Sequence, residues 1–153
     1  FEIRFDVKDD KLGLNQPVFY NGDNVRLSFW STKDAYVHLL SVDNEGYVAL
    51  LYPNKYGKNN FLRSGEIFRF PNPGKLELKA VLPAGQKETI EILQIILTKD
   101  VPMFTVEETK EKPMGPFKQL SLGDVSVVSK RLSKLEKENW TMQVIPIEIK
   151  SRD

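Results

Sequence analysis

The sequence predicts a mainly β fold, an antiparallel, immunoglobulin-like β-sandwich with one C-terminal helix. Short apolar runs rich in β-branched and aromatic residues recur along the chain, separated by turn residues about every 8 to 12 positions. A helical period of apolar residues occurs only late in the chain. Because 153 residues with 41% hydrophobic side chains suffice for one sizeable core, we expect a single domain over residues 1-153.

The N-terminal runs alternate between apolar and polar residues, as strands with one buried face do. Residues 1–7, FEIRFDV, and residues 24–31, NVRLSFWS, both show this alternation and are predicted strands. Between them, residues 9–17, DDKLGLNQP, are expected to form a loop. Residues 21–23, NGD, are expected to form a turn, because Asn-Gly tolerates a positive φ.

A hairpin is predicted next. Residues 35–42, AYVHLLSV, and residues 46–52, GYVALLY, flank the sequence DNEG at 43–46. A type I turn favours Asp at its first position and Gly at its fourth, so these two runs should pair through that turn. Both runs are apolar at nearly every position, which predicts strands that are covered on both faces or lie centrally in a sheet.

Three further strands are predicted before residue 100. They are residues 66–71, EIFRFP, residues 75–83, KLELKAVLP, and residues 88–99, ETIEILQIILTK, which form the longest β-branched run. Residues 99–117 follow, with three prolines and several charges. This composition predicts an extended loop or an excursion at the edge of a sheet.

The last part of the chain changes to a helical period. A helix is predicted at about 122-138, with Ser121 and Asp124 as a capping box at its start. The apolar residues of this segment fall on one stripe: Leu122, Val125, Val128, Leu132 and Leu135. A final strand is predicted at about 140-149. The helix should cover an open end or one face of the sheets.

Composition excludes several classes of protein. The net charge is +1, from 22 basic and 21 acidic side chains, which argues against a nucleic-acid partner and against binding to a membrane surface. No apolar window approaches the length of a membrane-spanning helix, so we expect no membrane insertion. The chain has no cysteine, which rules out disulfides, thiolate catalysis and cysteine-bound metals.

Residues suited to catalysis are few. His38, the only histidine, could act as a base or a metal ligand, but a strand histidine hydrogen-bonded to a neighbour is the preferred interpretation. Ser64 lacks the glycine two positions before it that a nucleophile elbow requires. Glu88 and Glu91 are three residues apart on a predicted strand, so they should lie on opposite faces. We therefore expect no catalytic residue, no metal site, no cofactor and no enzymatic activity.

The stretch after the hairpin is the best candidate for a binding surface. Aromatic rings offer contact area at low entropic cost, and amides both donate and accept hydrogen bonds. The candidate ligand- or partner-binding residues are Tyr52, Lys55, Tyr56, Lys58, Asn59 and Asn60. The alternative is a purely structural connection, in which Tyr52 packs against the core, Pro53 ends the strand and Asn54 caps a turn.

A set of turn motifs resembles the bacterial domain of unknown function 4384. The motifs are Gly22-Asp23, Ala35 to Val37, Val42 to Gly46, Leu51 to Asn54, Leu62 to Glu66 and Pro83 to Gly85. They are specific as a set and cover roughly residues 15 to 100. The resemblance implies an accessory, non-catalytic β-rich module that sits beside other domains in exported, envelope-associated or signalling bacterial proteins. It carries over no catalytic residue.

Together, these observations lead us to expect a non-catalytic interaction or accessory domain of a larger bacterial envelope or exported protein. Its partners would be another protein or other domains of the same chain. Its expected location is extracytoplasmic, in the periplasm or cell envelope. The alternative function is a carbohydrate- or peptide-binding module that uses the loop at residues 52-60.

Overall fold

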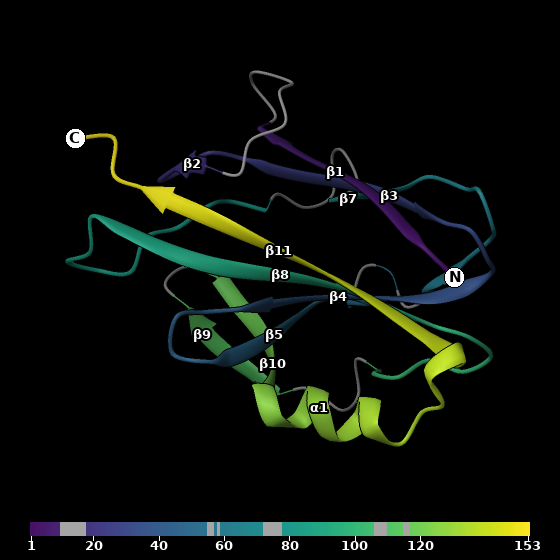
Figure 1. Cartoon of the computed structure of the whole chain (residues 1–153). Helices are drawn as coiled ribbons and strands as arrows, with labels where there is room; N and C mark the ends of the chain where they lie inside the picture. Colours follow the sequence, from purple (N-terminus) through teal and green to yellow (C-terminus); the bar gives the residue numbers. More distant parts are fainter. Residues whose placement is uncertain (10–17, 55–56, 58, 72–77, 106–109, 115–116) are drawn as a thin grey trace.

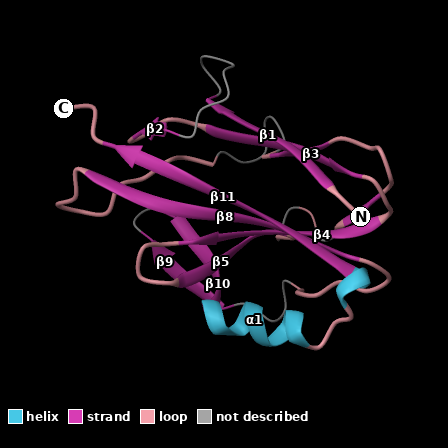
Figure 2. Ribbon diagram, viewed as in Figure 1, coloured by secondary structure: helices cyan, strands magenta, loops and turns pink. Residues whose placement is uncertain are grey.

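The computed structural model describes residues 1–9, 18–54, 57, 59–71, 78–105, 110–114 and 117–153. These residues form two β-sheets in a sandwich-like arrangement, with the helix α1 (Val125–Ser133) against the larger sheet (Figure 1). A short 3-10 helix, η2 (Lys137–Asn139), leads from α1 into the last strand (Figure 2). The prediction of a mainly β fold with one helix near the C-terminus is confirmed.

The smaller sheet has three antiparallel strands in the order β1 (Ile3–Asp9), β3 (Val25–Ser31) and β7 (Phe68–Phe70). The larger sheet has the order β2 (Val18–Tyr20), β11 (Trp140–Lys150), β8 (Glu88–Thr98), β4 (Ala35–Val42), β5 (Tyr47–Tyr52), β10 (Phe117–Asp124) and β9 (Lys110–Met114), while β6 (Phe61–Leu62) pairs with β4. Its pairs are antiparallel except that of β2 with β11, which is parallel.

Two apolar cores lie on opposite faces of the larger sheet. One fills the space between the sheets and includes Phe29 of β3 and Ile95 of β8. The other lies under the helix and brings Ile96 together with Val128 and Leu132 of α1. Burial of a side chain of this size stabilises the fold by about 1.5–3 kcal/mol. The strand β4 and the C-terminal half of β8, residues 93–98, are therefore covered on both faces, as the continuous apolar run of β4 predicts.

The predicted hairpin is confirmed, and its turn has the expected hydrogen bonds. The Gly46 N–H donates to the Asp43 carbonyl oxygen at 3.1 Å. The Asp43 side chain accepts hydrogen bonds from the N–H groups of Glu45 and Tyr47. Gly46 has φ = 86°, a conformation that a residue without Cβ adopts at no steric cost. The turn motif of this segment is thus set by the needs of the backbone.

The predicted helix is wrong in its extent. It spans Val125–Ser133 rather than about 122-138, because β10 continues to Asp124 and pairs with Tyr47 of β5. Ser121 and Asp124, the predicted capping box, therefore lie in the strand β10. The pairing of β10 with β5 thus overrides the local helical period. The last strand, Trp140–Lys150, closely matches its prediction.

For residues 99–117, the structure has the predicted excursion at the edge of a sheet, because β9 and the start of β10 form a hairpin there. Strands at an edge need no continuous apolar pattern, so this hairpin has a weak sequence signal. In the predicted strand 75–83, residues 75–77 lie outside the described residues. Residues 78–82 form no strand but one bridge, Asn24 with Lys79. The predicted loop 9–17 likewise lies outside the described residues from residue 10 onward.

Candidate functional site

Tyr52, the first residue of the predicted binding loop, is fixed in place by a ring contact and by a hydrogen bond. Its ring packs edge-on against Phe68, with centroids 4.8 Å apart, and its hydroxyl donates a 2.7 Å hydrogen bond to the Asn59 carbonyl oxygen. Burial raises the pKa of Tyr52. A Cβ at Gly57 would lie 3.1 Å from this ring, so a larger residue there would require the ring to shift by a few tenths of an ångström. The hydrogen bond from Tyr52 to Asn59 therefore connects the two ends of the loop.

The side chain of Asn60 is likewise used for a hydrogen bond to the backbone. It is buried, and its side-chain amide donates to the Val37 carbonyl oxygen at 2.9 Å, while its own carbonyl accepts the Val37 N–H at 2.7 Å. Asn59 is exposed, and its side-chain oxygen accepts the Phe61 N–H at 3.2 Å. The candidates Lys55, Tyr56 and Lys58 lie outside the described residues. Among the described candidates, Asn59 is thus the one with an exposed side chain.

A pocket begins where this loop ends. It is an open hollow of about 630 Å³, here called the β4–β6 pocket. It is lined by residues 32–36, by Phe61 and Ser64, and by Lys99 and Asp100. The three segments come together because β6 pairs with the start of β4 and β8 ends beside it. The pocket therefore exists only through tertiary pairing.

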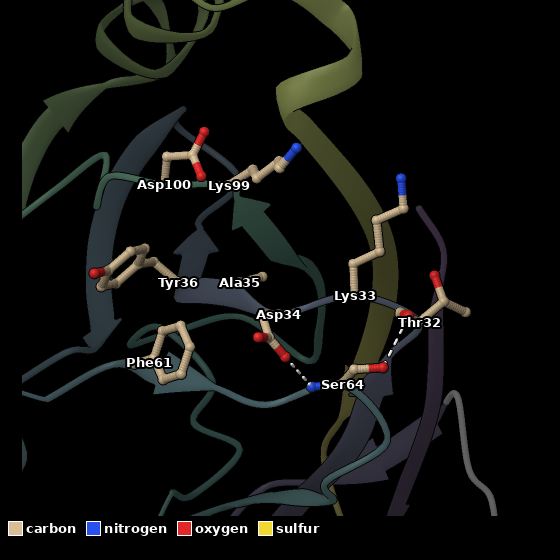
Figure 3. Close-up of a pocket in the computed structure, with 9 residues that line it drawn as sticks. All are labelled: Thr32, Lys33, Asp34, Ala35, Tyr36, Phe61, Ser64, Lys99 and Asp100. Atoms are coloured by element: carbon tan, nitrogen blue, oxygen red, sulfur yellow. Dashed lines mark hydrogen bonds between the residues drawn. The ribbon is translucent and has the colours of Figure 1, made fainter.

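Two aromatic rings form one wall of the pocket (Figure 3). Tyr36 and Phe61 are opposite each other in the β4–β6 pair, and their rings meet edge to face with centroids 5.5 Å apart. Phe61 is 45% exposed, although apolar rings of this size are usually covered. An exposed aromatic pair of this kind offers a ready contact for an apolar group of a partner.

Hydrogen bonds fix the polar side of the pocket. The Asp34 carboxylate accepts the Ser64 N–H at 2.7 Å, and the Ser64 hydroxyl donates to the Thr32 carbonyl oxygen at 2.9 Å. Both bonds are drawn in Figure 3. Lys33 and Lys99 add two ammonium groups at the rim. The open pocket thus combines an apolar wall with polar groups that hydrogen bonds hold in place.

The backbone at Asp100 is strained. This residue has φ = 72°, a conformation uncommon for residues with a side chain, and the Val101 N–H donates to the Lys99 carbonyl oxygen across it at 2.9 Å. The Thr98 hydroxyl holds the turn by donating to the Val101 carbonyl oxygen at 2.6 Å. The turn aims Asp100 and Lys99 at the pocket.

His38 is buried in β4, on the face that α1 covers. Its Nδ1 lies 3.2 Å from the Ile96 carbonyl oxygen, and its Nε2 accepts the Met103 N–H at 2.8 Å. Because a carbonyl only accepts and an N–H only donates, these partners assign the neutral ring with its hydrogen on Nδ1. The ring therefore ties the 99–105 loop to the sheet, as the structural interpretation of this histidine expects.

The two candidate carboxylates of β8 lie on opposite faces, as their spacing predicts. Glu88 is exposed, whereas Glu91 is partly buried and accepts a hydrogen bond from the Ser41 hydroxyl. In the part of the chain that the structure describes, no three His, Cys, Asp or Glu side chains gather in a way that could hold a metal ion. Within the same residues, no helix is long and apolar enough to cross a membrane.

Fold and pocket together define a small, two-sheet β module that carries an open, aromatic-walled surface. The chain belongs to the family described as Domain of unknown function (DUF4384), whose model matches residues 18–100. Searches of the curated proteins and of the solved structures found no match. The matched region ends at Asp100 and so includes every segment that lines the β4–β6 pocket.

The pocket is not evident from the sequence alone, although two residues of the sequence point toward it. An aromatic residue, Phe61, directly follows the candidate Asn59-Asn60 pair. Tyr36 lies in the aromatic start of β4, which is one of the family motifs. Their contact depends on a two-residue strand, β6, which is too short to produce a periodic pattern.

Proposed function

We propose that this chain is a non-catalytic accessory module that binds a segment of another protein, or of another domain in the same chain, at the β4–β6 pocket. The observation that supports this most is the Tyr36–Phe61 pair, in which a large ring stays 45% exposed beside an open hollow. Exposed aromatic residues are enriched at protein interfaces, where they anchor the contact.

The chemistry of the pocket favours a peptide with an apolar side chain next to acidic residues. The ring wall would take the apolar group, and Lys33 and Lys99 at the rim would meet carboxylates. Of the two acidic residues that line the pocket, Asp34 is already engaged by the Ser64 N–H. This hydrogen bond holds the Asp34 carboxylate in place at the polar side of the pocket.

A peptide array tests this proposal. The wild-type chain is probed on arrays of random and acidic-aromatic peptides, and binding peptides are then measured in solution. Phe61→Ala should weaken binding about tenfold or more, because it removes a central aromatic contact. Tyr47→Ala is the matched control, since Tyr47 is 50% exposed but lies outside the pocket. Equal binding by wild type and Phe61→Ala would rule the pocket out.

A carbohydrate- or peptide-binding role of loop 52-60 is the second candidate. It is favoured by the exposed Asn59 side chain, which directly precedes the pocket residue Phe61. A glycan array distinguishes the two, with Tyr56→Ala and Asn59→Ala as test variants. If a glycan is bound and both variants bind it as well as wild type does, this loop is not the site.

The proposed setting is a larger bacterial envelope or exported protein, with the module outside the cytoplasm. This part of the proposal rests on the kinds of protein in which modules of this family occur. Fractionation of cells that produce the full-length protein tests it. Recovery of the protein in the cytoplasmic fraction alone would contradict the extracytoplasmic location.

A further inference from the structure

The outer side of β11 is an open sheet edge. Strand β11 pairs with β8 over its whole length, residues 140–150, but its other side pairs with β2 only at residues 148–150. Among the described strands, none pairs with the outer side of residues 140–147. Figure 1 shows β2 beside the C-terminal end of β11 alone. The solvent exposure of these residues agrees with an unpaired edge, since residues 140–143 are partly exposed and Val144 is exposed.

Two hydrogen bonds define which main-chain groups face outward. The Asn139 carbonyl oxygen accepts the Lys99 N–H on the β8 side, and the Lys150 carbonyl oxygen accepts the Asn21 N–H on the β2 side. Main-chain groups of a strand alternate between its two sides. The outward groups therefore belong to the even-numbered residues Trp140, Met142, Val144 and Pro146. Pro146 lacks an N–H, and because it faces outward it leaves the ladder with β8 intact.

The side chains of this edge do little to prevent pairing. Natural proteins protect exposed edges with charged residues, bulges or very short strands. Residues 140–147, WTMQVIPI, carry no charge, and Pro146 is the one protective residue among them. Val144 is 41% exposed, and Ile90 of the adjacent strand β8 is 59% exposed. An uncharged edge next to apolar surface is suited to pairing with another strand.

We propose that this edge pairs with the same edge of a second copy, antiparallel and two-fold symmetric, with the axis at Gln143. Only even-numbered residues can pair with even-numbered ones, because those carry the outward groups. With the axis at Gln143, Met142 faces Val144 of the second copy and Trp140 faces Pro146 of the second copy. This register covers both exposed residues, Val144 and Pro146.

A second copy fits this edge better than a charged partner does. Residues 140–146, which pair in this register, offer no charged group, so their self-pairing sets no like charges opposite each other. At the axis, the two Gln143 side chains meet, and an amide can both donate to and accept from its own copy. A two-fold contact needs such a self-complementary patch.

Sedimentation and light scattering of the intact chain over a range of concentrations test this proposal. Wild type should be dimeric at high concentration, and Val144→Lys should shift the dimer dissociation constant upward by at least about tenfold, since it places two charges in the interface. Val81→Lys is the control, because Val81 is 56% exposed and lies outside the strands. A wild type that stays monomeric, or a Val144→Lys variant that dimerises equally well, overturns the proposal.

A disulfide tests the register without weakening the fold. The chain has no cysteine, so Gln143→Cys introduces a single thiol. Facing residues of this kind are about 4.5 Å apart at Cα, within the range a disulfide spans. Mild oxidation should give a covalent dimer on a non-reducing gel. Thr141→Cys is the control and should stay monomeric, since it faces Ile145 of the second copy. A non-covalent dimer that Gln143→Cys fails to cross-link overturns the proposed pairing.

Discussion

The guanidinium of Arg152 pairs with the carboxylate of Asp23, 129 residues earlier in the chain. The Asp23 side chain is only 6% exposed, and its other oxygen accepts the Tyr20 N–H at 2.9 Å. Arg152 also donates to the Asn21 carbonyl oxygen. The Gly-Asp motif of the family thus forms a turn that carries a buried carboxylate, and the C-terminus of this chain neutralises it.

This relationship predicts that Arg152→Ala lowers the free energy of unfolding by about 1 kcal/mol, because the guanidinium is half exposed and partly screened by water. Asp23→Ala should cost more, about 1–3 kcal/mol, since it also leaves the Tyr20 N–H unpaired. Urea unfolding measures both. Lys150→Ala is the control, because its pair with Glu148 is exposed on both sides. Equal stability of Arg152→Ala and Lys150→Ala would contradict a special role for the Asp23 pair.

The buried carboxyl of Glu91 predicts a pH-dependent stability. Burial raises the pKa of Glu91 above its ordinary value of 4.5, the Ser41 hydrogen bond partly opposes this, and the charge of Asp43 adds to it. The folded state therefore holds this proton more tightly than the unfolded state. The resulting stabilisation is fully present below the ordinary glutamate pKa and is lost as the pH rises through the raised pKa of the folded protein.

Glu91→Gln tests this directly, because a glutamine keeps an acceptor for Ser41 but has no charge. We expect the variant to be more stable than wild type at pH 8 and to lose this advantage at about pH 4. Chemical denaturation across that range measures the difference. Glu88→Gln, on the opposite, exposed face, should show no such change. An advantage of Glu91→Gln that is the same at every pH would disprove the explanation.

The parts of the fold that sequence predicts well are those where burial and turn chemistry act locally. In β3, every second residue is buried, as its alternation predicts, and the Asp43–Gly46 turn follows from two residue types. The edge hairpin of β9 and β10 is predicted only as an edge excursion without strands, because edge strands need little apolar periodicity. Gly123 and its pairing neighbours continue β10 into a segment whose own pattern is helical.

The geometry of the candidate site is harder to predict from sequence, because it depends on contacts between distant residues. Tyr52 and Asn60 have the residue types of a binding loop, but their polar groups are used by Asn59 and Val37. Residue type alone does not distinguish these two uses of a hydrogen bond. The β4–β6 pocket, by contrast, depends on Tyr36 and Phe61, which are distant in sequence and meet only through strand pairing.

The two hydrogen bonds of His38 predict a large cost for its removal. His38→Leu would leave the Met103 N–H unpaired in the core, at about 1–3 kcal/mol, whereas the Ile96 carbonyl oxygen keeps its place in the ladder with β4. His38→Gln can keep an acceptor near Met103 and should lose less. Thermal unfolding ranks the variants, and amide hydrogen exchange at Met103 should accelerate in His38→Leu. Unchanged exchange there would show that the Met103 bond does not anchor the loop.

The strained turn at Asp100 leads to a prediction about the stability of variants at this position. With φ = 72°, a β-branched residue at this position would meet steric conflict, whereas glycine would not. Asp100→Val should lower the free energy of unfolding by about 1–2 kcal/mol relative to Asp100→Gly, with Asp100→Asn close to wild type, since Asn tolerates this conformation best after glycine. Asp100 is exposed, so lost packing does not confuse the comparison. Urea unfolding of the three variants measures their order of stability. A Val variant as stable as the Gly variant would mean that the turn relaxes away from this conformation, and the Lys99 side of the pocket would then not be fixed by it.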